Sequence, residues 1–336
     1  MISAVLACIL VAGGFGAAYA EPDDDYLAIL KEYSPDGYYL ASRTGSARYV
    51  FGDTIVTADP VSAYINKGSR LSVALSLPEA IHEATHHYTD IMGCKRLHES
   101  GSEAGPGRAY LYYTGGKSSV FVRLTPSYPF SLMRPAVPDH PATMRFSLLA
   151  QSSEAGHGVY ELLDEWNAYL RSADLCLELL PLFWRLQDYD GIVSFYTIYG
   201  TLWTGMAEFR FYVLEYLVRA SEEEQAIYRQ MYTNGPLLHA LRRIDSQTAR
   251  HLDRYFRIKS THARRLRSER ISTVERDGLL VFTYPDGSSI SVETQRDEYE
   301  FLLVLMNAKR YVKTSRSFGM LPSLPQYNST VDGSAQ

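Results

Sequence analysis

The spacing of apolar residues predicts that much of the chain is helical. Between residues 158 and 257, Leu, Trp, Phe and Tyr recur at intervals of three and four, which is the period of an amphipathic helix. Two shorter segments, 26–33 and 297–308, are also predicted to be helical. The predicted long helices cover residues 158–187, 193–219, 222–232 and 235–257.

Strands are predicted where β-branched and aromatic residues gather. Residues 49–57 and 70–76 have this composition. Residues 110–124 and 279–293 predict two β-hairpins, because a short apolar run stands on each side of a glycine-containing turn. Five prolines within residues 126–141 exclude regular structure there, so this segment is predicted to connect two lobes.

Together these elements predict an α+β fold that is predominantly helical. We divide the chain into a leader (1–20), an N-terminal α+β lobe (21–135), a helical lobe (136–268), an appendage of a hairpin and a helix (269–313) and a tail (314–336). The tail is rich in Ser, Pro and Gly and is predicted to be disordered. At 336 residues and 46% apolar content, the chain can bury a large core.

The first twenty residues resemble a secretory signal peptide. They are small and apolar, contain no charged side chain, and end in Ala18-Tyr19-Ala20, a small-x-small cleavage site. We therefore expect an exported protein, periplasmic or extracellular, whose mature chain starts at Glu21. A lipoprotein site at Cys8 is disfavoured because the apolar run continues beyond it, and the run is too short and too rich in glycine for a retained membrane span.

The mature chain contains two cysteines, Cys94 and Cys176. In an oxidising compartment such a pair often forms a disulfide. Two buried thiols are the alternative, and the sequence leaves both open. Neither cysteine stands in a spacing typical of a metal site.

The overall charge disfavours one class of partner. A net charge of −5 and a pI near 6.0 give no general attraction to nucleic acid or to anionic lipid. We therefore expect no nucleic-acid partner. The 26 tyrosines could line a cleft for peptides or sugars, but many of them fall at helical spacing beside Leu and Phe and are predicted to be core residues.

A further predicted helix carries the residues with the clearest chemical meaning. Ser76 is a suitable N-cap, Glu79 three residues later completes a capping box, and Pro78 is tolerated in the first turn. We therefore expect the helix to begin near Leu77.

Residues 82–86, His-Glu-Ala-Thr-His, follow within this helix. Residues four apart lie on one face of a helix, so His82 and His86 can reach one metal ion, with Glu83 beside them as a base for a water molecule. The apolar residues of the helix fall on the opposite arc. The two histidines are therefore predicted to be a ligand pair that faces a cleft, or else part of a solvated helix face.

A catalytic zinc site takes three protein ligands and leaves one position for water. The best candidates for the third ligand are Glu161 and Glu165, one turn apart in the predicted helix at 158–187. Glu165 lies nearer to the edge of the buried stripe of this helix, so we favour Glu165 and keep Glu161 as the alternate. The opposing interpretation is an exposed acidic face that pairs with Arg171.

The motif at residues 82–86 and the later glutamate-bearing helix resemble the gluzincin branch of the zincin metallopeptidases. The resemblance implies a Zn²⁺ cofactor held by His82, His86 and one glutamate, with Glu83 as the general base. It also implies one strand-containing lobe and one helical lobe, with a peptide cleft between them. The interval between His86 and either glutamate is longer than in the best-known members, so no subfamily is assigned.

Other residues are candidates for supporting roles. Asp90, four residues after His86, or else Asp164 could fix the orientation of that imidazole through its second nitrogen. Tyr169 and His157 are candidate donors to the oxyanion that forms during hydrolysis.

These residues predict a zinc-dependent peptidase whose partner is a peptide or protein substrate. In the expected mechanism zinc lowers the pKa of its water to about 7, and Glu83 takes the proton before hydroxide adds to the amide carbonyl. Glu83 then returns the proton to the leaving amine. Two alternatives remain: an exported binding or envelope protein with an incidental or structural metal site, and a zinc hydrolase of non-peptide amides or esters.

Overall fold

The structure, a computed structural model, describes residues 25–46, 48–102, 108–149, 156–185 and 189–327. Of these residues, 67% are helical and 11% lie in strands. The prediction of a predominantly helical α+β fold is therefore confirmed. No helix among the described residues combines the length and the apolar character that a membrane span needs.

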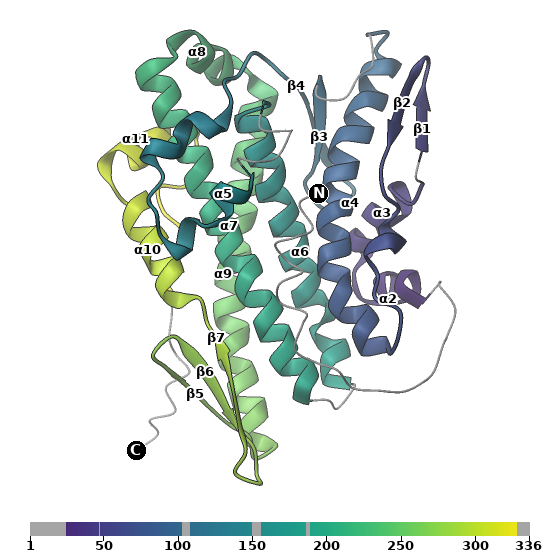
Figure 1. The fold of residues 1–336 in the computed structure, drawn as a ribbon, viewed down its shortest axis with the longest axis vertical. Coiled ribbons are helices and arrows are strands. Elements are labelled where there is room, and N and C mark those ends of the chain that lie inside the picture. The colour runs from purple at the N-terminus through teal and green to yellow at the C-terminus, as the bar shows by residue number, and fades with distance from the viewer. Residues whose placement is uncertain (1–24, 47, 103–107, 150–155, 186–188, 328–336) are drawn as a thin grey trace.

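Four long helices run side by side and form the body of the molecule (Figure 1). Helix α6 packs directly against the other three. One continuous cluster of buried apolar side chains joins them and includes residues on both sides of the predicted lobe boundary at 135/136. The four helices are α4 (Arg70–Glu99), α6 (Val159–Arg185), α7 (Tyr189–Glu223) and α9 (Gly235–Ser268).

Helix α4 begins earlier than predicted, so the strand expected at residues 70–76 is wrong. Ser69 is the N-cap, and its hydroxyl accepts a hydrogen bond from the amide of Ser72. The hydroxyl of Ser76, the predicted cap, instead donates to the carbonyl of Val73. Val73 is buried together with two other residues at helical spacing, and this burial outweighs the strand-like composition of the segment. The two others are Ala74 and Leu77.

The other helical predictions hold, with small changes at the ends. Helix α9 ends eleven residues beyond the predicted end at 257, because the basic run at 262–267 continues it. Three helices were not predicted: α3 (Pro35–Arg43), α5 (Arg145–Leu149) and α11 (Lys309–Phe318). The remaining helices of this set are α2 (Asp25–Tyr33), α8 (Gln225–Thr233) and α10 (Arg296–Met306).

The strands form three small antiparallel sheets. Both predicted hairpins are confirmed, and in the first the turn uses Gly115 and Gly116, both at positive φ. The segment at 49–57 is a hairpin and not a single strand, because Gly52 at φ 59° turns the chain. The sheets contain β1 (Arg48–Phe51) with β2 (Thr54–Thr57), β3 (Ala109–Tyr113) with β4 (Ser119–Arg123), and β5 (Ser272–Arg276), β6 (Leu279–Thr283) and β7 (Ser289–Glu293). Strand β5 was not predicted, and its sheet projects at one end of the helical body (Figure 1).

The proline-rich segment contains only short 3₁₀ turns, η2 (Phe130–Ala136) and η3 (Pro141–Thr143). It packs against α7, where the rings of Tyr128 and Tyr216 stack with centroids 4.0 Å apart. Each of these tyrosines also donates its hydroxyl proton to the backbone carbonyl of the other. The segment is thereby fixed to the helical body and leads directly into α5.

The predicted disordered tail is wrong as far as residue 327. Helix α11 (Lys309–Phe318) extends into it, and the backbone of Leu321 is held on both sides by buried groups. Its carbonyl accepts from the Arg210 guanidinium at 2.5 Å, and its amide donates to Asp245 at 2.6 Å. Composition alone suggested disorder because these anchors lie far away in the sequence. Residues 328–336 lie outside the described residues.

The two cysteines of the mature chain are separate buried thiols, so the disulfide considered above is absent. Cys94 lies on α4 in a small apolar cluster with Val56 and Ile91, whereas Cys176 lies on α6 in the main core. The leader at 1–20 and Cys8 lie outside the described residues.

Candidate metal centre

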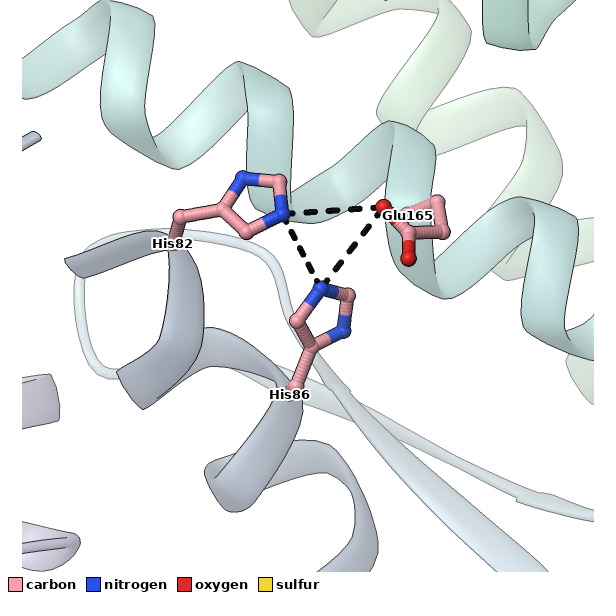
Figure 2. Close-up of side chains that lie close together, drawn as sticks. All are labelled: His82, His86 and Glu165. Carbon is pink, nitrogen blue, oxygen red and sulfur yellow. Dashed lines mark hydrogen bonds and ion pairs between the residues drawn. The ribbon is translucent and has the colours of Figure 1, made fainter. Parts of the chain in front are cut away.

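Helices α4 and α6 bring His82, His86 and Glu165 together (Figure 2). The two Nε2 atoms are 3.1 Å apart, and Oε2 of Glu165 is 3.6 Å from that of His82 and 3.7 Å from that of His86. His82 and Glu165 are buried, whereas His86 is partly accessible. Residues far apart in the sequence therefore point three ligand-type atoms at one spot.

The three separations fit a single zinc ion. A triangle with sides of 3.1, 3.6 and 3.7 Å has a circumscribed circle with a radius of about 2.0 Å, which is the usual distance from zinc to imidazole nitrogen or carboxylate oxygen. One ion can therefore lie near ligand distance from all three atoms, and a small shift of the side chains toward one another would bring it out of their plane into tetrahedral coordination. Three protein ligands also leave a fourth tetrahedral position for water or substrate.

The hydrogen bond made by His86 also indicates that a cation could lie between the three atoms. Nδ1 of His86 is hydrogen-bonded to Oδ2 of Asp164 at 2.6 Å, and because a carboxylate only accepts, Nδ1 carries the proton. The pKa of this ring is raised well above its ordinary value, so without a metal Nε2 also carries a proton toward His82 and Glu165, and a bound cation would take the place of that proton. Lone pairs that converge at this distance repel one another unless a cation or a proton lies between them.

The charges around His86 are predominantly acidic. Burial lowers the pKa of this imidazole, but the carboxylates of Asp164 and Glu165 raise it well above its ordinary value. Burial raises the pKa of Glu165, yet His86 and the other imidazole hold that pKa below its ordinary value. Glu165 is therefore ionised, and the site attracts positive charge.

Helix α4 is enclosed on two sides, and this excludes the solvated helix face considered above. On one side Gly93 allows β3 to approach, since a Cβ there would lie 2.2 Å from the carbonyl oxygen of Ala109. On the other side α4 meets α6, where the hydroxyl of Ser172 donates to the carbonyl of Pro78 at 2.8 Å. The histidines lie in this second interface, and His82 is only 3% exposed.

Of the two candidate glutamates, Glu165 is the one that lies beside the imidazoles. Glu161 is buried one turn earlier on α6 and does not belong to the group. The opposing interpretation, an exposed acidic face pairing with Arg171, is wrong. Both glutamates are buried, and Arg171 forms its ion pair with Asp174 at 3.3 Å.

The orientation of His86 comes from α6 and not from its own helix. Asp164, next to Glu165 in the sequence, makes the hydrogen bond to Nδ1 of His86. Asp90, the other predicted partner, is half-buried one turn further along α4. Two adjacent residues of α6 therefore act on the group: Glu165 supplies one candidate ligand atom, and Asp164 orients His86.

His82, His86 and Glu165 are called the metal group below. Glu83 is half-buried and lies within electrostatic reach of this group. Its charge raises the pKa of His86, although less strongly than the aspartate and glutamate of α6 do. It also acts on Tyr64 in the 3₁₀ turn η1 (Val61–Tyr64), whose pKa is raised to about 12 by burial first and by Glu83 second. Glu83 is therefore close enough to His86 for its charge to act on that imidazole.

Tyr169, one turn after Glu165, lies against the metal group. Its ring meets the ring of His82 edge-on, with centroids 4.8 Å apart. Burial raises its pKa to about 12, so the hydroxyl keeps its proton at neutral pH. Nε of Arg145 donates to this hydroxyl at 3.1 Å. Arg145 was not predicted, because no motif or spacing in the sequence points to it.

His157, the other predicted oxyanion donor, lies elsewhere. Its Nδ1 is hydrogen-bonded to the hydroxyl of Tyr110 in β3 at 3.1 Å. It precedes Glu165 by eight residues, which corresponds to about 12 Å along a helix. The structure therefore does not bring His157 to the metal group.

The group as a whole contains two imidazoles and one carboxylate that could hold a metal ion, and Tyr169 lies against it. No family model, curated protein or solved structure matches the chain significantly. The function proposed below is therefore derived from the geometry and chemistry of these side chains.

Proposed function

We propose that the chain is a zinc-dependent metallopeptidase. The observation that carries this proposal is the convergence of three ligand atoms, two on α4 and one on α6, at separations of 3.1, 3.6 and 3.7 Å. Imidazole and carboxylate together suit zinc, and a set of three protein ligands is typical of catalytic sites, whereas structural sites take four.

Each residue of the site has a definite part in peptide hydrolysis. His82, His86 and Glu165 would hold the zinc ion, which when bound supplies a water activated at neutral pH and polarises a carbonyl. Glu83 accepts the proton of the attacking water and returns it to the leaving amine. Tyr169 donates its hydroxyl proton to the oxyanion that develops on the substrate carbonyl.

We also propose a gluzincin-like arrangement, with the peptide bound between the segments 21–135 and 136–268. Two features support it: the histidine pair lies in the first segment, and the glutamate lies on a helix of the second. We further propose that the protein is exported, periplasmic or extracellular, on the basis of the apolar leader ending in Ala18-Tyr19-Ala20.

The test begins with metal analysis of the mature chain purified from residue 21. We expect about one zinc per chain, and cleavage of a mixed peptide pool when products are followed by mass spectrometry. Glu83→Gln should keep the zinc while hydrolysis falls by about 10²–10⁴-fold, because the proton acceptor is lost. Glu99→Gln, a change at an exposed glutamate of the same helix, is the matched control and should keep both.

The alternatives predict other results in the same experiment. Zinc binding without cleavage of any peptide, amide or ester would indicate a binding protein. Cleavage of small amides or esters but not of peptides would indicate a different substrate class at the same site. Full peptide hydrolysis by Glu83→Gln would show that the proposed base is wrong.

A further inference from the structure

Arg145, the first residue of α5, is hydrogen-bonded to Tyr169, whose ring lies against that of His82. Its Nε donates to the hydroxyl oxygen of Tyr169 at 3.1 Å, and its guanidinium lies over the Tyr169 ring, 5.4 Å from the centroid. Arg145 comes from the segment that follows the proline-rich connection, outside both helices that carry the ligands.

The guanidinium is held on its other sides as well. Nη1 forms an ion pair with Glu208 of α7, and Nη2 donates to the carbonyl of Thr201 at 2.9 Å. The backbone amide of Arg145 donates to the same Glu208 carboxylate at 2.9 Å, and Tyr212 donates its hydroxyl proton to it. Arg145 is 6% exposed and Glu208 is fully buried. These contacts leave the guanidinium a single orientation.

This arrangement determines what Tyr169 can do with its proton. An arginine only donates, so the phenolic oxygen accepts from Arg145 and its own proton remains for another acceptor. The ring cannot turn away, because Phe209 stacks on it at 5.2 Å and a Cβ at Gly205 would lie 2.5 Å from it. Only rotation of the hydroxyl is left, and the bond from Arg145 restricts that rotation.

We propose that Arg145 is a positioning residue that fixes the hydroxyl of Tyr169 as a donor to the oxyanion of the substrate. The inference rests on the proposed function and extends it to a residue outside the ligand-bearing helices. Arg145 itself contacts neither substrate nor metal in this scheme. Its effect on turnover therefore passes entirely through Tyr169.

A purely structural ion pair is the competing explanation, and the molecule offers a matched control. Arg210 on α7 is fully buried and pairs with Asp245 at 2.7 Å. Its other contacts are with Met306 and Leu321, away from the metal group. Replacing either arginine by lysine keeps the charge and removes the planar, multi-donor geometry. Only Arg145→Lys should alter catalysis by a route that requires Tyr169.

The first test is a double-mutant cycle in the zinc-loaded protein. Tyr169→Phe should lower kcat by about 10²-fold, the usual effect of removing an oxyanion donor. Arg145→Lys should lower kcat by about 10-fold or more with little change in KM, and adding it to Tyr169→Phe should cause no further loss. Arg210→Lys should lower thermal stability while kcat stays close to that of the unchanged protein. Glu208→Gln, which loosens the guanidinium without removing it, should repeat the behaviour of Arg145→Lys.

The second test does not depend on turnover. The protein is loaded with Co²⁺, and binding of acetohydroxamic acid is followed through the visible absorption of the cobalt. The hydroxamate oxygen takes the place of the oxyanion, so Arg145→Lys and Tyr169→Phe should each weaken its binding about 10-fold, and the double variant should bind no more weakly than Tyr169→Phe alone. Affinity for Co²⁺ should be unchanged in all three.

The outcomes separate the two proposals. If the unchanged protein fails to bind Co²⁺, the metal site and with it the proposed function are wrong. If Co²⁺ and hydroxamate bind but the effects of Arg145→Lys and Tyr169→Phe add, or Arg145→Lys behaves as Arg210→Lys does, then Arg145 is structural and the positioning role is overturned.

Discussion

Two histidines in this protein are each hydrogen-bonded to an aspartate of helix α6, yet their surroundings differ. Nδ1 of His86 is 2.6 Å from Asp164, and Nδ1 of His251 is 2.7 Å from Asp174. Beyond the ring, Nε2 of His251 accepts a hydrogen bond from the hydroxyl of Tyr199. Nε2 of His86 faces a second imidazole and a carboxylate instead.

The difference shows what distinguishes a ligand from a structural histidine. Burial raises the pKa of Tyr199 well above its ordinary value, so the phenol keeps its proton and satisfies the lone pair of His251. Nε2 of His86 instead faces Nε2 of His82 and Oε2 of Glu165, two atoms that can also bind a metal, and a proton or a cation must lie between them. The histidine–aspartate pair is common to both places, and the group beyond the imidazole separates them.

The largest expected effect comes from removing each histidine in turn. His86→Ala should weaken zinc binding by more than about 100-fold, since losing a ligand should exceed the 10–100-fold cost of losing its support. His251→Ala should keep the zinc and lower stability by about 1–3 kcal/mol, because buried partners are left unpaired. Mass spectrometry of metal content and chemical denaturation measure the two quantities. Equal zinc loss in both variants would remove the distinction.

A second comparison concerns the two glutamates one turn apart on α6. Glu165→Gln should lower zinc affinity by about 100-fold, because the site loses its anionic ligand. Glu161→Gln should change that affinity by less than about threefold, since Glu161 lies outside the group. Competition with a coloured chelator gives both affinities. A stronger effect of Glu161→Gln would show that the third ligand is Glu161 and that its assignment to Glu165 is wrong.

The aspartates sharpen the contrast further. Asp164→Asn should weaken zinc binding about 10–100-fold, because the amide no longer fixes the ring of His86 as the carboxylate does. Asp174→Asn makes the same change beside His251 and should leave zinc affinity unaltered. Isothermal titration of both variants with zinc provides the measurement, and similar affinities in the two would contradict the prediction.

The smallest effect concerns the buried His262. Burial first, and Arg265 second, lower the pKa of His262 to about 4, and Tyr196 is hydrogen-bonded to its Nδ1. In the unfolded chain His262 has a pKa near 6.5, so it is protonated at pH values where the folded chain keeps it neutral. The free energy of unfolding therefore falls as the pH drops from about 6.5 to about 4. Between pH 7 and 5.5 we expect a loss of about 1 kcal/mol, measured by urea denaturation. His262→Gln should remove that part of the pH dependence, and an unchanged profile would contradict the pKa shift.

The sequence was sufficient where local geometry decides the outcome. Four-residue spacing within a helix placed His82 beside His86, and helical rotation favoured Glu165 over Glu161. The long helices were predicted because their apolar residues follow one period over many turns.

Tertiary contacts decided what the sequence could not. Arg145 lies 24 residues from Tyr169 and 63 from Glu208, without any periodic relation to either. Whether Asp164 or Asp90 is hydrogen-bonded to His86 depends on how α6 packs against α4, and this cannot be derived from the sequence of either helix alone. The start of α4 was missed because the composition of residues 70–76 suggested a strand, whereas burial against neighbouring elements favoured the helix.

The anchoring of the C-terminal segment has a practical consequence for producing the protein. Trimming the chain at residue 313, as its composition invites, would remove Phe318, which is completely buried, and the backbone of Leu321 that Arg210 and Asp245 hold. Such a shortened chain would expose apolar surface, and the buried Arg210–Asp245 ion pair would lose its hydrogen bonds to the Leu321 backbone. An affinity tag should therefore be placed after residue 327 or before residue 21.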